Sequence, residues 1–365
     1  MSMDFIDALS EIEREKGISK EVLIDAIEAA LISSYKRNFN TAQNVRVDIN
    51  RATGVIKVYA RKNVVDEVLD PRLEISLHAA REHNPNYQMD DICEIEVTPR
   101  DFGRIAAQTA KQVVTQRIRE AERGLIYNAF IDKSDDIVTG IVQRQDMRNV
   151  YVDLGKVEAV LPLNELMPNE KFKHGDRTKA YITKVENTTK GPQIILSRTH
   201  PGLLKRLFEL EVPEIFDGVV EIKSVAREAG QRSKIAVYSR NEEVDPVGSC
   251  VGPKGMRVQT IVNELRGEKI DIVRWSEDVS EYVANALSPS KVVDVEVREA
   301  EKMARVIVPD YQLSLAIGIK GQNARLAAKL TGWKIDIKSE TQADEEGLPM
   351  SSDEHTPDDS MEVSE

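Results

Sequence analysis

The hydrophobic pattern changes its period along the chain, and each change predicts a different kind of element. Near the N-terminus, apolar residues recur every three to four positions, which is typical of helices that bury one face. The first helix is predicted to end near Gly17, and Ser19 is predicted to cap the second. The apolar positions of these two helices are Phe5, Leu9 and Ile12, then Leu23, Ile27, Ala30 and Leu31.

The period then falls to two before it returns to that of a helix. Residues 45–49 and 56–60 alternate apolar and polar side chains around a turn-like segment, so they predict a hairpin. A long helix is predicted over residues 104–123, and together these elements predict an α/β head over residues 1–130. The predicted inward stripe of the long helix is Ala107, Ala110, Val114, Ile118 and Ala121. The cations on its neighbouring faces are Arg104, Lys111 and Arg119. By default, such cations only solvate the surface of a helix.

Residues 131–200 carry short apolar runs separated by turn residues, which predict a small β-barrel. The predicted strands are residues 137–142, 150–155, 159–162, 179–183 and 193–197. The segments Val152-Asp153-Leu154-Gly155 and Leu196-Ser197-Arg198 resemble the S1 type of OB-fold. Aromatic and basic side chains expected to be exposed and to bind RNA are Tyr151, Phe172, Lys173 and His174. A structural role stays open for them, because small barrels also place aromatic residues at rims and lysines on edges.

One motif occurs twice. It reads Gly252-Pro253-Lys254-Gly255 and, further along, Gly318-Ile319-Lys320-Gly321. After each copy comes an apolar helix pattern and then a Lys-Ile-Asp-Ile strand, at residues 269–272 and 334–337. These units resemble KH domains of the prokaryotic topology, and we expect the two domains over residues 201–277 and 278–340.

Glycines that flank a lysine suit a sugar-phosphate backbone. They let the main chain approach the phosphate, and the lysine adds positive charge. A single Gly-x-x-Gly can be no more than a turn between helices, but its repetition in the same context favours single-stranded RNA. The candidate RNA-binding residues are Gly252, Pro253, Lys254, Gly255 and Arg257 in the first copy, and Gly318, Ile319, Lys320, Gly321 and Asn323 in the second.

The net charge of −12 over 365 residues is unusual for an RNA-binding chain, but most of this charge lies at one end. Residues 339–365 hold ten acidic residues and no Lys or Arg, which leaves about −2 for the rest. With few aliphatic residues, this end is predicted to be a disordered tail over residues 341–365. It would serve solubility, or compete with phosphate for basic side chains.

The order of head, S1-type barrel and two KH units resembles the NusA family of bacterial transcription factors. The most specific stretches are residues 104–113, 212–215, 245–252 and 267–273. The resemblance implies that the head docks on RNA polymerase, with Arg104 and Lys111 on the polymerase or hairpin-RNA surface. It also implies that the barrel and KH units contact nascent RNA to modulate pausing, termination and antitermination, together with other Nus-type factors. Some members carry two further acidic repeats, whose functions are not expected here.

The residues indicate a scaffold without chemistry of its own. We find no His-Glu-x-x-His or phosphate-loop pattern, and expect no catalytic residue, metal or cofactor. Cys93 and Cys250 are predicted to be buried small hydrophobes. With no apolar run long enough for a membrane span, we expect a cytoplasmic monomer. Two alternatives remain: an RNA-processing enzyme, for which residues 1–130 are too few to form the catalytic core, and a translation or ribosome-assembly factor.

Overall fold

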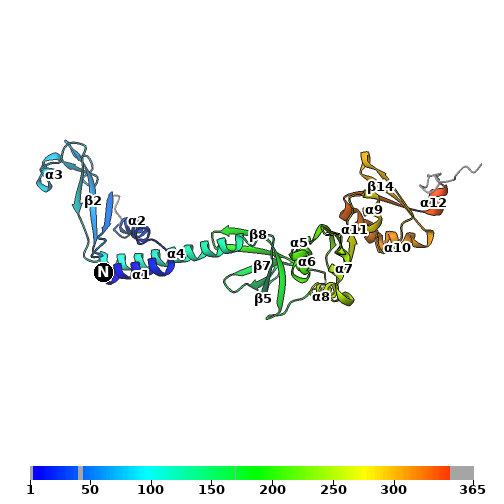
Figure 1. Cartoon of the computed structure of the whole chain (residues 1–365). Helices are drawn as coiled ribbons and strands as arrows, with labels where there is room; N and C mark the ends of the chain where they lie inside the picture. The colour runs from blue at the N-terminus through cyan, green and yellow to red at the C-terminus, as the bar shows by residue number, and fades with distance from the viewer. Residues whose placement is uncertain (1–2, 40–43, 169, 346–365) are drawn as a thin grey trace, which may run out of the picture. The chain divides into compact units, whose positions relative to one another are not determined.

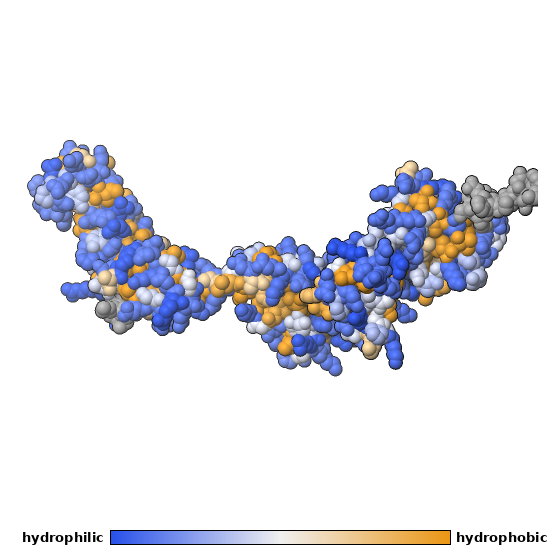
Figure 2. All heavy atoms as spheres, viewed as in Figure 1, coloured by the Kyte–Doolittle hydropathy of each residue, from blue (hydrophilic) through white to orange (hydrophobic). Residues whose placement is uncertain are grey.

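The computed structural model describes residues 3–39, 44–168 and 170–345 (Figure 1). The chain divides into two compact units, Met1–Asn128 and Ala129–Glu365. Polar residues cover most of the surface in the view of Figure 2, and apolar residues gather in several patches on both units. Within the described ranges, no helix has the length and apolar character that a bilayer crossing requires.

The first unit packs helices against a four-stranded sheet. Its elements are α1 (Met3–Lys16), α2 (Lys20–Asn38), β1 (Val45–Ile49), β2 (Ile56–Val65), β3 (Glu74–Ser76), α3 (Leu77–His83), β4 (Ile92–Glu96) and α4 (Phe102–Ile131). Strand β2 is central, because it pairs antiparallel with β1 and β4 and parallel with β3. The main core lies between α1, α2, the start of α4 and the β1–β2 hairpin. The predicted α/β head and its hairpin are confirmed.

The start of α2 differs in one detail from the prediction. Ser19 does precede the helix, but its side chain makes no capping hydrogen bond. The N–H of Lys20 donates instead to Oε1 of Glu13, at 3.1 Å. A side chain from the preceding helix therefore satisfies one of the amides that helix starts leave open.

The buried stripe of α4 also differs from the predicted one. The fully buried positions at its start are Phe102, Ala106 and Ala110, whereas Ala107 is exposed. The helix begins at Phe102, whose ring enters the core, and burial continues from there at intervals of four residues. Because the prediction began the helix at Arg104, it missed this anchor and placed Ala107 inward, whereas the predicted Ala110 is buried and the predicted Val114 packs against the core.

The second unit starts with a closed barrel in the strand order β5-β6-β7-β9-β8. Its strands are β5 (Ile137–Gln145), β6 (Asn149–Asp153), β7 (Glu158–Pro162), β8 (Arg177–Thr188) and β9 (Gly191–Ser197). All five predicted strands are present. Gly140 on β5 is required by close packing, because a Cβ there would lie 2.4 Å from Cγ1 of Val152 on the neighbouring strand.

Two domains of the same topology follow, named here KH1 and KH2. KH1 contains α5 (Pro201–Glu211), α6 (Pro213–Phe216), β10 (Val220–Glu228), β11 (Arg232–Ser239), α7 (Pro246–Val251), α8 (Met256–Glu264) and β12 (Lys269–Arg274). KH2 contains α9 (Val279–Ala286), β13 (Asp294–Arg298), β14 (Met303–Val308), α10 (Leu313–Ile317), α11 (Gln322–Thr331) and β15 (Lys334–Ser339). In each, the middle strand pairs antiparallel with the first and parallel with the last. The predicted KH topology is confirmed, and the short helix α6 was not predicted.

KH1 and KH2 share a hydrophobic core. One face of the KH1 sheet, with Ala226, Ala236 and Val273, packs with residues of α9 and α11 of KH2. The other face, with Ile235 and Val237, packs on the helices of KH1 itself. Strand β11 is therefore buried on both sides, and the KH1 sheet lies between two helical layers.

The prediction of a disordered tail is wrong for its first residues. Glu340–Glu345 form the short helix α12, which packs on β14 and β15 and buries Ala343 completely. The hydroxyl of Thr341 also donates to Oδ2 of Asp310, at 2.7 Å. One buried alanine and two hydrogen bonds from Thr341 to Asp310 hold this turn, and such specific contacts are not visible in an average composition. Residues 346–365, the rest of the predicted tail, lie outside the described residues.

Candidate nucleic-acid interface

The two glycine loops have nearly the same main-chain conformation. In KH1, the φ/ψ angles are 73°/175° at Gly252, 52°/24° at Lys254 and 77°/12° at Gly255. In KH2, they are 75°/173° at Gly318, 54°/29° at Lys320 and 73°/18° at Gly321. Each loop thus holds a lysine in the left-handed region between its glycines, which is uncommon for a residue with a side chain. The repeat seen in the sequence is a repeat of structure.

The first glycine of each loop is demanded by geometry. Its φ/ψ combination is one that only glycine adopts readily. A Cβ on Gly252 would lie 2.6 Å from Cγ of Arg257, and one on Gly318 would lie 2.8 Å from Cβ of Asn323. The loop main chain therefore lies directly on the first turn of the helix that follows it.

The tips of both loops face solvent. Pro253, Lys254 and Lys320 are exposed, and the side chain of Ile319 is 85% exposed. Two lysines and an exposed main chain are thus presented where the sequence predicts contact with phosphate. The structure places the eight predicted loop residues as two surface turns, one in each KH domain.

Arg257 and Asn323 follow the loops at the same position, and both turn inward. Nη1 of Arg257 donates to Oε2 of Glu214 at 2.9 Å and to the carbonyl of Ser249 at 2.6 Å. Asn323 is buried, and its Nδ2 donates to two carbonyls. These belong to Leu287 and Ala316, both at 3.0 Å. The sequence predicts these two side chains as RNA contacts. In the structure their polar groups bond to neighbouring protein atoms instead, and these bonds shape the loops.

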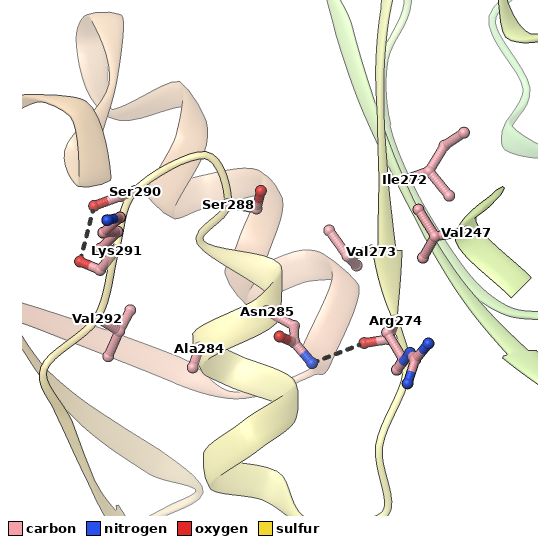
Figure 3. Close-up of a pocket in the computed structure, with 10 residues that line it drawn as sticks. All are labelled: Val247, Ile272, Val273, Arg274, Ala284, Asn285, Ser288, Ser290, Lys291 and Val292. Atoms are coloured by element: carbon pink, nitrogen blue, oxygen red, sulfur yellow. Dashed lines mark hydrogen bonds between the residues drawn. The ribbon is translucent and has the colours of Figure 1, made fainter. Parts of the chain in front are cut away.

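An open groove with a volume of about 550 Å³ lies between KH1 and KH2. Figure 3 shows β12, with Ile272, Val273 and Arg274, facing α9, with Ala284 and Asn285. Nδ2 of Asn285 donates to the carbonyl of Arg274 across the groove, at 3.3 Å. The remaining lining residues are Val247 on α7 and Ser288, Ser290, Lys291 and Val292 after α9.

The groove has the chemistry that suits unpaired bases. Apolar side chains form its walls, and among them lie an amide, two hydroxyls and a lysine of KH2 and the guanidinium of Arg274 of KH1. The sequence analysis did not name these residues, because they come from segments that meet only when KH2 covers the KH1 sheet. One feature of the sequence does point to a contact between the two domains. The link near Asp278 is short, so it leaves the domains little freedom to separate.

The candidate residues of the barrel are not equally accessible. The guanidinium carbon of Arg144 lies 3.5 Å from the centroid of the half-buried Tyr151 ring, and the Tyr151 hydroxyl donates to Oδ2 of Asp146 at 2.9 Å. Phe172 is 9% exposed, which contradicts the expectation that it faces solvent. Lys173 and His174 are exposed, although Nδ1 of His174 lies 2.7 Å from the Gln143 carbonyl.

Phe172 lies beside a buried charged pair. The guanidinium of Arg198 is 6.0 Å from the Phe172 ring, and its Nη2 is 2.9 Å from Oε1 of Glu170. Both side chains of that pair are 1% exposed. The ring therefore helps to exclude water from an ion pair rather than offering a stacking surface.

On the head, Arg104 and Lys111 are both exposed on α4. They lie seven residues apart, which is about two helical turns, so they share one face of the helix. This face is separate from the buried stripe of Phe102, Ala106 and Ala110. The structure is thus compatible with a basic surface for a partner at this place.

Neither cysteine has the surroundings of a reactive site. Cys93 and Cys250 are free and buried, as predicted. Burial raises the pKa of the Cys250 thiol to about 12, and burial also raises that of Cys93. Across residues 3–39, 44–168 and 170–345, no cluster of His, Cys, Asp and Glu has the arrangement of a metal site.

Comparison with known protein families divides the chain in the same order as the structure does. Residues 4–124 match the NusA N-terminal domain, and residues 131–198 match the S1 RNA binding domain. Residues 198–275 match the NusA-like first KH domain, and residues 279–345 match the NusA-like second KH domain.

Three curated relatives named transcription termination/antitermination protein NusA align over almost the entire chain. The protein of Halalkalibacterium halodurans is 77% identical, over 95% of this chain and 91% of its own. That of Bacillus subtilis is 73% identical, over 95% of this chain and 94% of its own. That of Thermus thermophilus is 43% identical, over 93% of this chain and 90% of its own. With four domain matches in this order and identities this high over this length, the chain belongs to the NusA family.

Proposed function

We propose that this chain is a transcription termination and antitermination factor that holds nascent single-stranded RNA in the glycine loops of KH1 and KH2. The observation that carries the proposal is the pair of loops with matching main-chain angles and solvent-facing lysines. The names of the relatives and the S1 and KH matches support it. The groove between KH1 and KH2 adds apolar walls with polar and cationic groups among them.

RNA binding is tested by placing carboxylates in the loops. Pro253→Asp with Lys254→Asp, or Ile319→Asp with Lys320→Asp, should each weaken the affinity for unstructured single-stranded RNA about tenfold, because a carboxylate repels phosphate where the lysine attracts it. Both segments are at the surface, so thermal unfolding should stay close to that of the parent. Fluorescence anisotropy with labelled RNA measures the affinity.

A matched control separates the loop effect from net charge. Lys205 and Leu210 are exposed on α5 of KH1, outside the loop. Aspartate at both positions lowers the charge of the same domain by three units, as the KH1 loop variant does, and should leave RNA affinity within about twofold of the parent. Parent-like RNA affinity in both loop variants would show that the loops do not bind RNA.

We further propose that the first unit docks on RNA polymerase through a surface that includes Arg104 and Lys111, and that Nus-type antitermination factors join the complex. Support comes from the family of residues 4–124 and from the shared exposed face of these two cations on α4. Because residues 1–128 form a compact unit with their own core, binding to polymerase should be separable from binding to RNA.

A pull-down against core polymerase tests this second proposal. The unit of residues 1–128 should retain polymerase, whereas residues 129–345 should retain it much less. Arg104→Ala with Lys111→Ala in the full chain should reduce retention about tenfold and shorten pauses in transcription assays. Arg14→Ala with Lys36→Ala, a matched loss of two exposed cations on other helices, should not. Retention by ribosomal subunits in place of polymerase would favour a translation factor.

A further inference from the structure

We propose that Glu228 of KH1 is a positioning residue for the glycine loop of KH2, so that the second loop depends on the first domain for its shape. This inference rests on the proposed RNA-binding function of the loops. Glu228 is the last residue of β10, and its side chain is 17% exposed. It reaches the first turn of α11, the helix that begins immediately after Gly321.

The contacts lead from the KH1 sheet into the KH2 loop. Oε1 of Glu228 accepts a hydrogen bond from Nε of Arg325 at 2.7 Å, and Oε2 accepts one from Nε2 of Gln322 at 2.8 Å. Nη1 of Arg325 then donates to the carbonyl of Lys320, inside the loop, at 3.2 Å. The hydrogen bond from Arg325 lowers the pKa of the Glu228 carboxyl, so the carboxylate is ionised at neutral pH. Hydrogen bonds between charged groups are stronger than neutral ones.

The KH1 loop has an anchor inside its own domain, and the KH2 loop lacks the equivalent. Below the KH1 loop, Arg257 pairs with Glu214 on α6. KH2 has no counterpart of α6, because residues 287–293, all described, connect α9 to β13 without a helix. Asn323 takes the position of Arg257 there and bonds to carbonyls of KH2. Glu228 therefore supplies from KH1 the carboxylate that α6 supplies to the first loop.

A second KH1 side chain reaches the other side of the same region. Lys234 on β11 is fully buried, and its Nζ donates to the carbonyl of Ser288, at 2.7 Å, and to Asp271, at 3.0 Å. The adjacent carbonyl, that of Leu287, accepts the hydrogen bond from Asn323 beneath the KH2 loop. KH1 thus contacts both the segment that follows α9, whose Leu287 carbonyl holds Asn323, and the helix that follows the KH2 loop. We take the Glu228 contact as the one to test, because Lys234 is also part of the core.

The test places Glu228→Ala in two backgrounds, each with one loop disabled. Where Pro253→Asp and Lys254→Asp disable the KH1 loop, the remaining RNA affinity depends on KH2, and Glu228→Ala should lower it about tenfold further. Where Ile319→Asp and Lys320→Asp disable the KH2 loop, the same change should have no further effect. Glu228→Gln keeps one acceptor oxygen, so its loss in the first background should be smaller.

The matched control is Glu221→Ala, on the same strand. Glu221 pairs within KH1, with Lys223 and Arg240, and its removal changes the net charge equally. It should not lower RNA affinity in the background where only the KH2 loop is active. An equal loss from Glu228→Ala in both backgrounds, or no loss in either, would overturn the positioning role. Parent-like RNA binding by both loop-disabled chains would instead refute the RNA-binding proposal.

Discussion

At the scale of single residues, the two loops separate residues that shape the main chain from residues that face solvent. Gly252 and Gly318 allow the chain to pass within van der Waals distance of the next helix. Arg257 and Asn323 fasten that helix to carbonyls beneath the loop. Lys254 and Lys320 are left at the surface with positive charge. The residues that carry solvent-facing positive charge are thus different from the residues that shape the loop, although all belong to one short motif.

This separation predicts unequal costs for the two glycines of a loop. Gly252→Ala should destabilise the fold by about 3 kcal/mol, because its φ/ψ is nearly forbidden to alanine and its Cβ would clash with Arg257. Gly255→Ala should cost only about 1 kcal/mol, since it is in the ordinary left-handed region and a Cβ there meets nothing within 4 Å. Urea unfolding measures both, and equal costs would contradict this account.

The sequence allowed the domains and loops to be predicted, because glycine spacing and strand alternation are local signals. It did not reveal the burial of Phe172, since whether an aromatic residue faces water depends on the Arg198–Glu170 pair beside it. Nor did it reveal the inward turn of Arg257, whose partner Glu214 lies in a helix that was not predicted. Contacts between segments that are distant in sequence produce no periodic pattern, so they cannot be predicted from the spacing of residues.

At the scale of elements, a buried ion pair joins the barrel to KH1. Arg198 follows β9, and its Nε donates to Oε2 of Glu170, in the segment after β7, at 3.0 Å. Its Nη2 donates to the carbonyl of Glu264, the last residue of α8 in KH1, at 3.0 Å. A third contact runs to the carbonyl of Lys179 on β8. One guanidinium therefore holds three elements from two domains together.

Removal of one partner should be far more damaging than removal of both. Arg198→Met or Glu170→Met alone should destabilise the second unit by about 3–5 kcal/mol, because each leaves a buried charge without its partner. The double substitution should recover part of that loss, because it removes both buried charges, although the carbonyls of Lys179 and Glu264 still lose their donor. Urea denaturation of the three variants checks the cycle, and additive losses would argue against coupling between the pair.

At the scale of the whole molecule, the family matches are divided between two compact units. The first carries the family match of the N-terminal domain, and the second carries the S1 and both KH matches. Within the second, KH1 and KH2 are packed against each other by a common core. Two weak contacts at fixed spacing bind one strand more tightly than either alone, because the second contact is made at high effective concentration.

The common core of KH1 and KH2 also has a consequence for the transcript. In the RNA complex proposed above, only a stretch of unpaired nucleotides that reaches from one loop to the other engages both at once, because the shared core packs the two domains together. When such a stretch pairs into a stem, its bases face each other and simultaneous contact with both loops is lost. We therefore expect the folding state of the emerging RNA, as much as its sequence, to decide whether this part of the protein stays attached.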